Sequence, residues 1–180
     1  MKFLLVYGTT EGQTQKIAQF VADRLTQLGH QTNLVNAVSP SAAPDPCVFD
    51  AVIIAASVHA GRYQSAIIQF VAKHLTSLNA RPNAFLSVSL AAASDDTDDV
   101  EGLKHCIARF IHETGWNPQR ICHVAGAFRY TEYDFLKRWA MKYIAYRKGA
   151  PTDTSRDHEL TDWADLAHFV EEFLASSPSP

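Results

Sequence analysis

The segment with the clearest chemical use lies near the N-terminus and reads Thr9-Thr10-Glu11-Gly12-Gln13-Thr14. An apolar run at 3–6 precedes it, and a helical pattern of apolar residues that reaches Leu28 follows it. A strand that gives way to a helix through such a turn directs free backbone N–H groups and the positive end of the helix dipole at one point. We therefore predict a phosphate site here, where Gly12 allows close approach and the threonine hydroxyls add donors.

The loop contains no lysine. Nucleotide triphosphatases place a lysine in the corresponding loop to hold the outer phosphates, so the sequence argues against that class. One phosphate monoester held by neutral donors fits better. A simpler interpretation, in which Thr9 or Thr10 only caps the helix, stays open at this point.

Strands and helices alternate along the chain. The strand candidates are short apolar runs at 3–6, 32–38, 51–56, 85–90 and 121–125. The helices between and after them are predicted from apolar faces at Ile17-Val21-Leu25-Leu28, Ile67-Val71-Leu75-Leu78, Val100-Leu103-Ile107-Phe110 and Leu166-Val170-Leu174. This order predicts an α/β fold with a doubly wound parallel sheet and helices on both faces.

In such a sheet the ligand lies beyond the carboxyl ends of the strands. The connections at 57–63 and 89–97 leave those ends, as does the connection at 126–130. The candidate binding residues there are Ser57, Val58, His59, Ala60, Gly61, Ser89, Leu90, Ala91 and Ala92. The small residues after Ser89 suit backbone contact with a planar ligand.

Residues 129–160 do not fit a minimal five-strand alternation and are predicted to be an insertion. Its first part, 129–148, has six Lys or Arg against two Asp or Glu on a chain whose net charge is −3. Projected as a helix, it separates aromatic from basic residues, which is typical of a helix lying in a membrane interface. The candidates for substrate or membrane contact are Arg129, Lys137, Arg138, Trp139, Lys142 and Tyr143. A helix packed on the domain with a solvated basic side is the alternative, and nucleic acid is disfavoured because no known binding module accompanies the charge.

The chain has 180 residues, 47% of them hydrophobic, which fits one globular domain. We predict a single domain at 1–175 that includes the insertion, followed by a flexible tail at 176–180. Three cysteines without a CxxC pair indicate buried free thiols in a reducing compartment. No signal peptide or membrane-spanning run is recognised, so a cytoplasmic location is expected, and no metal site is expected either.

The loop after the first strand resembles that of flavodoxins, whose hydroxyl-x-x-Gly-x-Thr pattern is matched by Thr9, Gly12 and Thr14. This resemblance implies a five-stranded sheet of order 2-1-3-4-5 that binds FMN, with the loops at 57–63 and 89–94 around its ring. Flavodoxins usually stack an aromatic residue on that ring, and only His59 and Tyr63 are candidates here. His59 is equally consistent with a solvent-exposed loop residue.

Three longer matches narrow the resemblance to one group within the flavodoxin-like proteins. They are Ala-Ser-Val-His-Ala-Gly-Arg-Tyr at 56–63, Ala-Gly-Ala-Phe-Arg-Tyr at 125–130, and Thr-Asp-Thr at 152–154 with Thr-Asp-Trp at 161–163. They are similar to the menaquinone-dependent protoporphyrinogen IX dehydrogenases of bacterial haem biosynthesis, whose characteristic insertion is also matched.

This resemblance implies an oxidoreductase that converts protoporphyrinogen IX to protoporphyrin IX and passes electrons through FMN to menaquinone or a similar quinone. It also implies peripheral association with the anionic inner face of the cell membrane. A homo-oligomer is left open. A soluble electron-transfer flavodoxin serving a redox protein is the alternative function, and a flavin-free interaction module is the third.

Overall fold

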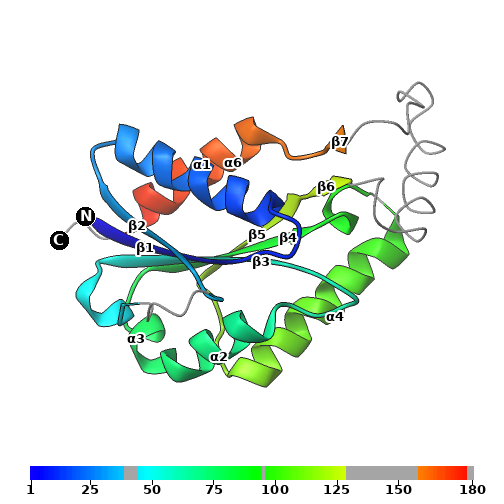
Figure 1. Cartoon of the computed structure of the whole chain (residues 1–180), viewed down its shortest axis with the longest axis horizontal. Coiled ribbons are helices and arrows are strands. Elements are labelled where there is room, and N and C mark those ends of the chain that lie inside the picture. The colour runs from blue at the N-terminus through cyan, green and yellow to red at the C-terminus, as the bar shows by residue number, and fades with distance from the viewer. Residues whose placement is uncertain (39–43, 95, 129–157, 178–180) are drawn as a thin grey trace.

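Five parallel strands form the centre of the protein (Figure 1). They are β1 (Lys2–Gly8), β2 (Gln31–Asn36), β3 (Ala51–Ser57), β4 (Asn83–Ser89) and β5 (Arg120–Ala125). The computed structural model describes residues 1–38, 44–94, 96–128 and 158–177. Neighbouring strands follow the order β2-β1-β3-β4-β5, so the predicted doubly wound sheet and its strand order are confirmed.

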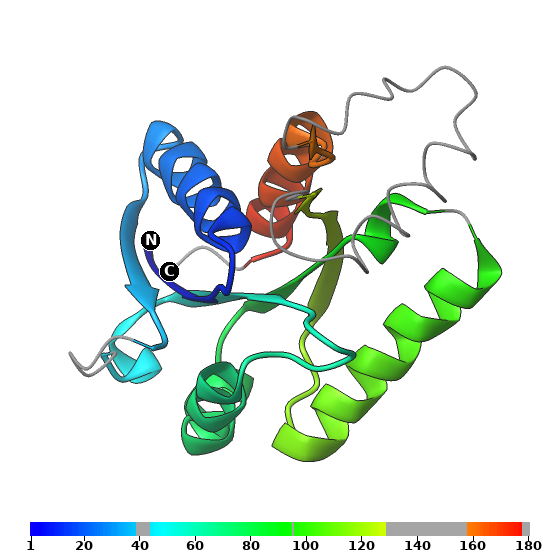
Figure 2. The same ribbon diagram turned by 45° about the vertical axis from the view of Figure 1, so that its right-hand side comes forward.

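Helices cover both faces of this sheet. One face carries α1 (Gln13–Gln27) and α6 (Trp163–Ser176), and the other carries α2 (Ser65–Lys73), α3 (Leu75–Asn79) and α4 (Thr97–Thr114). Short 3-10 turns, η1 (Pro46–Val48) and η2 (Ala91–Ala93), lie in two of the connections. Figure 2 shows the connection that leaves β3 extending toward α4 before it turns back into α2. Within the described residues, every helix is too short or too polar to cross a bilayer.

The core has two halves, one on each side of the sheet. Phe3, Leu5 and Tyr7 of β1 pack toward α1 and α6, whereas Leu4 and Val6 pack toward the opposite helices. Every residue from 51 to 56 in β3 is at most 3% exposed. This double burial explains why the β3 sequence has no polar alternation.

A two-stranded antiparallel ribbon, β6 (Ala127–Phe128) with β7 (His158–Glu159), follows the sheet in the chain. The chain between its strands, 129–157, lies outside the described residues. It contains the six candidates for substrate or membrane contact and the predicted interfacial helix. Beyond the ribbon, α6 runs to Ser176, and the Ser177 hydroxyl donates to the Phe173 carbonyl oxygen at 2.8 Å.

Several local predictions need correction. The second strand ends at Asn36 rather than 38, because the Asn36 side chain accepts the Val38 N–H at 3.0 Å and turns the chain. The helix predicted across 67–78 is divided at His74 into α2 and α3. Leu28 and Val100, which were assigned to apolar faces, are 40% and 38% exposed.

The cysteines are all free, but the prediction that they are buried is wrong in part. Cys47 is exposed, whereas Cys106 and Cys122 are half-buried. Burial raises the pKa of the Cys122 thiol to about 11 and also raises the pKa of Cys106. Both half-buried thiols therefore stay protonated at neutral pH, which makes them poor nucleophiles.

Candidate functional site

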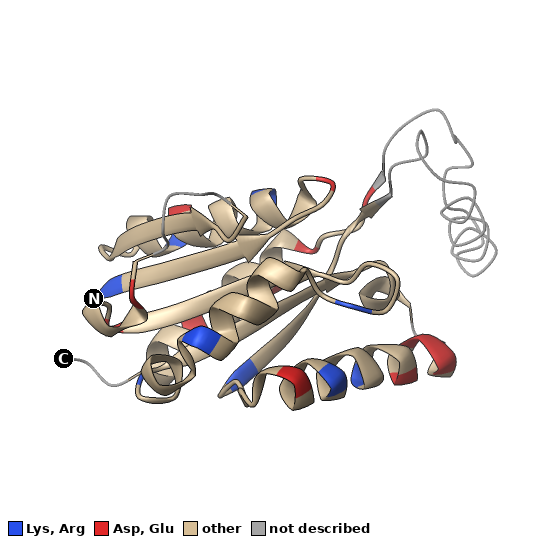
Figure 3. Ribbon diagram, turned by 60° about the horizontal axis from the view of Figure 1, so that its bottom comes forward, with Lys and Arg blue, Asp and Glu red and all other residues tan. Residues whose placement is uncertain are grey.

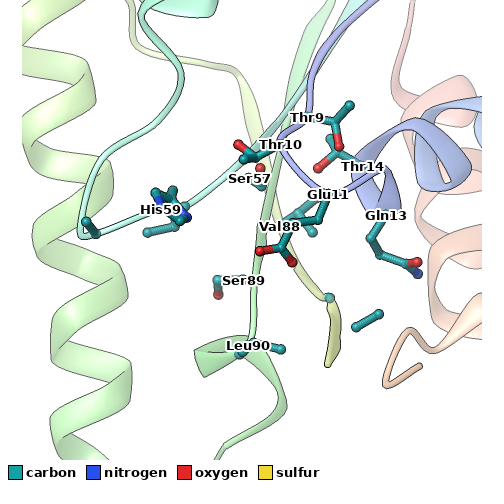
Figure 4. A pocket seen from close by; sticks show the side chains of 14 residues that line it. Thr9, Thr10, Glu11, Gln13, Thr14, Ser57, His59, Val88, Ser89 and Leu90 are labelled. Carbon is teal, nitrogen blue, oxygen red and sulfur yellow. The ribbon is translucent and has the colours of Figure 1, made fainter. Parts of the chain in front are cut away.

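A cleft opens at the carboxyl end of the sheet, where the turns after β1, β3, β4 and β5 meet (Figure 4). It encloses about 600 Å³ of empty space including its open mouth. Its lining consists of Thr9, Thr10, Glu11, Gln13, Thr14, Ser57, Val58, His59, Ala60, Val88, Ser89, Leu90, Gly126 and Ala127. The four predicted connections thus come together around one space.

Four predicted binding residues do not line this cleft. Gly12 lies at the start of α1, Gly61 and Ala91 line a separate groove beside α4, and Ala92 faces the side of β5. Val88 also lines the cleft and was not predicted, whereas Gly126 and Ala127 were predicted only as part of the connection at 126–130. A glycine directly after a predicted strand, as at 126, was a usable signal for a close approach at that edge.

The first turn of α1 carries the features expected of an anion site. Gly12 is its N-cap with φ +90°, no side chain caps it, and its first turn contains no acidic residue. By contrast, α4 and α6 begin at Asp96 and Asp162, whose carboxylates accept first-turn N–H groups. The N–H groups of α1 thus lack the acidic partner that the other two helices supply themselves.

The interpretation in which a threonine caps α1 is wrong. The Thr9 hydroxyl accepts the Gly12 N–H at 2.8 Å and closes the turn before the helix instead. Thr14 is 1% exposed, and its Oγ1 is buried without a hydrogen-bond partner among the described residues. A buried hydroxyl left without a partner is unfavourable, so a phosphate oxygen in the cleft would supply the missing acceptor.

Glu11 does not occupy this anion position. Figure 4 shows its carboxylate directed away from Thr9 and Thr14, toward Val88 and the middle of the cleft. The hydroxyls of Thr9 and Thr14, together with the uncapped N–H groups at the start of α1, therefore fit the phosphate of FMN.

The connection after β3 forms a tight turn beside the cleft. Backbone hydrogen bonds of 2.8 and 3.0 Å join His59 and Arg62, and the two central residues, Ala60 and Gly61, have φ +48° and +74°. These angles are typical of a type I′ turn. The Val58 N–H donates to the Val88 carbonyl oxygen at 2.8 Å, which joins this turn to β4. His59 is exposed and lines the cleft, so its imidazole is open to both solvent and ligand.

The prediction that Tyr63 is a candidate to stack on the flavin ring is wrong. Tyr63 is 6% exposed, and its hydroxyl lies 2.7 Å from Ser87 Oγ inside the sheet–helix core. Its ring makes edge contacts with Phe85 and Phe110. Burial raises the pKa of the Tyr63 hydroxyl well above its usual value. This side chain therefore stabilises the core under the turn.

Side-chain hydrogen bonds on two sides hold the walls of the cleft to the loop after β1. Gln64 Nε2 donates to Ser57 Oγ at 2.6 Å and to Thr10 Oγ1 at 3.4 Å. On the other side, Gln13 Nε2 donates to Thr161 Oγ1 at 2.9 Å, and the Thr161 hydroxyl donates to the Ala125 carbonyl oxygen at 2.7 Å. The turn after β3 and the end of β5 are thus both held against the segment from Thr10 to Gln13.

A flavodoxin-domain family model matches residues 4–155 of the chain. The chain belongs to the flavodoxin family. Its structure agrees, since it superimposes on oxidised flavodoxin 1 from Bacillus cereus with a TM-score of 0.59 and 12% sequence identity, covering 99% of this chain and 100% of the other. At that identity the likeness concerns the fold.

Two relatives with assigned activities place the chain in one group within this family. The chain is 36% identical over 180 residues to the quinone-type protoporphyrinogen IX dehydrogenase of Escherichia coli K12, covering 100% of this chain and 98% of that enzyme. An enzyme of the same name from Leishmania major is 30% identical over 177 residues, covering 97% of this chain and 75% of its relative. The expected membership of this group of oxidoreductases is confirmed.

Proposed function

We propose that the cleft binds FMN and that the protein uses it to oxidise protoporphyrinogen IX to protoporphyrin IX with a quinone as electron acceptor. The proposal is carried by the full-length similarity to relatives of that name. The uncapped start of α1 and the buried Thr14 hydroxyl support the phosphate position. The ring of FMN would lie between the residues from Ser57 to Ala60 and the residues Ser89 and Leu90.

The reaction removes six hydrogens from the tetrapyrrole in three two-electron steps, and three quinones become three quinols. FMN supplies the two-electron chemistry of each step when bound. The protein's part is to hold and orient the reactants and to accept protons. Among the described residues that line the cleft, Glu11 and His59 carry a carboxylate and an imidazole that could accept a proton. The proton released in each step passes to one of them or to water.

An anaerobic assay tests the acceptor. The protein should convert protoporphyrinogen IX to the fluorescent porphyrin only when a menaquinone analogue is present, because the electrons need an acceptor other than oxygen. Protein stripped of FMN serves as the control. Porphyrin formation at the same rate without quinone would contradict the proposal that a quinone is the electron acceptor. Flavin reduction by a one-electron protein donor, with no porphyrin formed, would favour the soluble electron carrier instead.

We also propose that the protein associates peripherally with the inner face of the membrane and that the insertion contacts the bilayer or the substrate. The support is the composition of 129–148, where basic and aromatic residues are concentrated. A lipid-soluble quinone is easiest to reach from the membrane surface. Haem biosynthesis and menaquinone as the particular quinone are part of the same proposal.

Vesicle co-sedimentation tests the membrane contact. Changing Lys137, Arg138 and Lys142 to Gln should weaken binding to anionic vesicles, since each cation near such a surface contributes about 1 kcal/mol. Added salt should produce the same loss in the wild type. The control changes three exposed lysines of the body, Lys16, Lys73 and Lys104, to Gln, which alters net charge equally. Equal sedimentation of both variants would contradict a role for the insertion.

A further inference from the structure

A second groove lies between the turn after β3 and the outer side of α4. Figure 4 shows the turn that carries His59 beside this helix. The groove holds about 820 Å³ of empty space including its mouth. Val58 and Ser89 line both this groove and the cleft, so a molecule in the groove lies one side chain away from the cleft.

Two glycines line the groove, Gly61 on the turn and Gly102 on α4. A Cβ atom added at Gly61 or at Gly102 would meet no atom of the described residues within 4 Å. Gly61 needs to be glycine for its backbone, since φ is +74°. Gly102 lies inside α4 with no positive φ, where alanine would make a more stable helix. Among the described residues, no packing contact requires a glycine at 102, and a larger side chain there would extend into open space beside the groove.

The walls of the groove are apolar and its ends carry opposite charges. Val58, Leu103 and Cys106 form the walls, and the Cys106 thiol donates to the Gly61 carbonyl oxygen at 3.5 Å. Asp98 and Asp99 stand at the N-terminal end of α4, and Arg109 stands further along it. Figure 3 shows α4 with acidic residues at its start, basic residues in its middle and a further acidic residue toward its end.

This charge pattern discriminates between the two reactants. A tetrapyrrole with two propionates would be attracted at Arg109 but repelled at Asp98 and Asp99. A flat, neutral ring with carbonyl acceptors meets apolar walls and, at one end, the N–H donors of His105 and Arg109. We propose that this groove binds the ring of the quinone acceptor, at a site separate from that of the tetrapyrrole.

The proposal rests on the proposed function and adds a location for its second reactant. A quinone in the groove takes up two electrons, which come from the tetrapyrrole through the cofactor in the adjoining cleft, and two protons from water to become a quinol. Because the two reactants would occupy different places, both could be bound at once.

Filling the groove tests this assignment. Gly102→Leu should weaken binding of 2,3-dimethyl-1,4-naphthoquinone to the FMN-loaded protein at least tenfold by calorimetry and raise the KM for that quinone. Its FMN content and the KM for protoporphyrinogen IX should not change. Ala108→Leu, at an exposed position of α4 outside the groove, is the matched control and should bind quinone like the wild type. Arg109→Gln provides a second variant and should also raise the KM for quinone.

The other outcomes overturn the assignment in distinct ways. Loss of FMN from Gly102→Leu would make the groove part of the cofactor site, and a raised KM for protoporphyrinogen alone would make it the tetrapyrrole site. Unchanged quinone binding in both Gly102→Leu and Arg109→Gln would show that the quinone does not bind in the groove. Calorimetry needs no turnover, so wild-type protein that binds quinone without oxidising protoporphyrinogen would refute the proposed function and not the groove.

Discussion

Protein with Gly12→Val should fold but purify almost free of FMN. Gly12 has φ +90°, where an L-residue costs roughly 1–2 kcal/mol and a β-branched side chain fits worst. The turn would relax away from this angle, which displaces the Thr9 hydroxyl that accepts the Gly12 N–H and the first N–H groups of α1. Flavin absorbance after release from the purified protein measures the loss, and circular dichroism reports the fold.

Gly29→Val is the matched control, because Gly29 ends the same helix with φ +85° and has nothing within 4 Å of an added Cβ. It should lose a similar amount of stability without losing FMN. If Gly12→Val retained FMN at the wild-type level, the phosphate could not lie at the start of α1.

Thr14→Val should weaken FMN binding by about 10- to 150-fold, which corresponds to a hydrogen bond to a charged group of roughly 1.5–3 kcal/mol. Without FMN, the Thr14→Val protein should be no less stable than the wild type, because the buried Thr14 hydroxyl has no partner among the described residues. This opposite behaviour of affinity and stability distinguishes a ligand contact from a core contact. Fluorescence titration with FMN and urea denaturation of the FMN-free protein measure the two quantities.

Thr114→Val supplies the comparison for this substitution. Thr114 is also buried, but its hydroxyl donates to the Phe110 carbonyl oxygen at 2.7 Å and accepts the Trp116 N–H at 3.2 Å. Removal of the Thr114 hydroxyl should therefore lower the free energy of unfolding by about 1–3 kcal/mol and leave FMN affinity unchanged. A destabilised FMN-free Thr14→Val protein with unaltered affinity would contradict the assignment of Thr14 to the phosphate.

Local patterns in the sequence were sufficient for the sheet, and they also identified the candidate phosphate loop. A run such as 51–56 reports burial on both faces directly, and the order of strands and helices leaves few ways to connect a parallel sheet. The loop at 9–14 could also be singled out from the sequence, because Gly12 and its neighbouring hydroxyl residues all lie within one turn of the chain. The resemblance to flavodoxins added the strand order and the cofactor. The assignments within 129–157 stay predictions from composition.

Only the tertiary structure decided which side chains face the cleft. Tyr63 is six residues from Ser57, yet its side chain points into the core. There its hydroxyl lies within hydrogen-bond distance of Ser87 and its ring packs against Phe85, both on β4. Thr161 reaches Gln13 across 148 residues of chain, and no local pattern marks such a partner. The open space beside Gly102 likewise depends on a turn 41 or more residues away, at 58–61. Strand and helix patterns depend on neighbours in sequence, whereas the lining of a site depends on how distant segments pack.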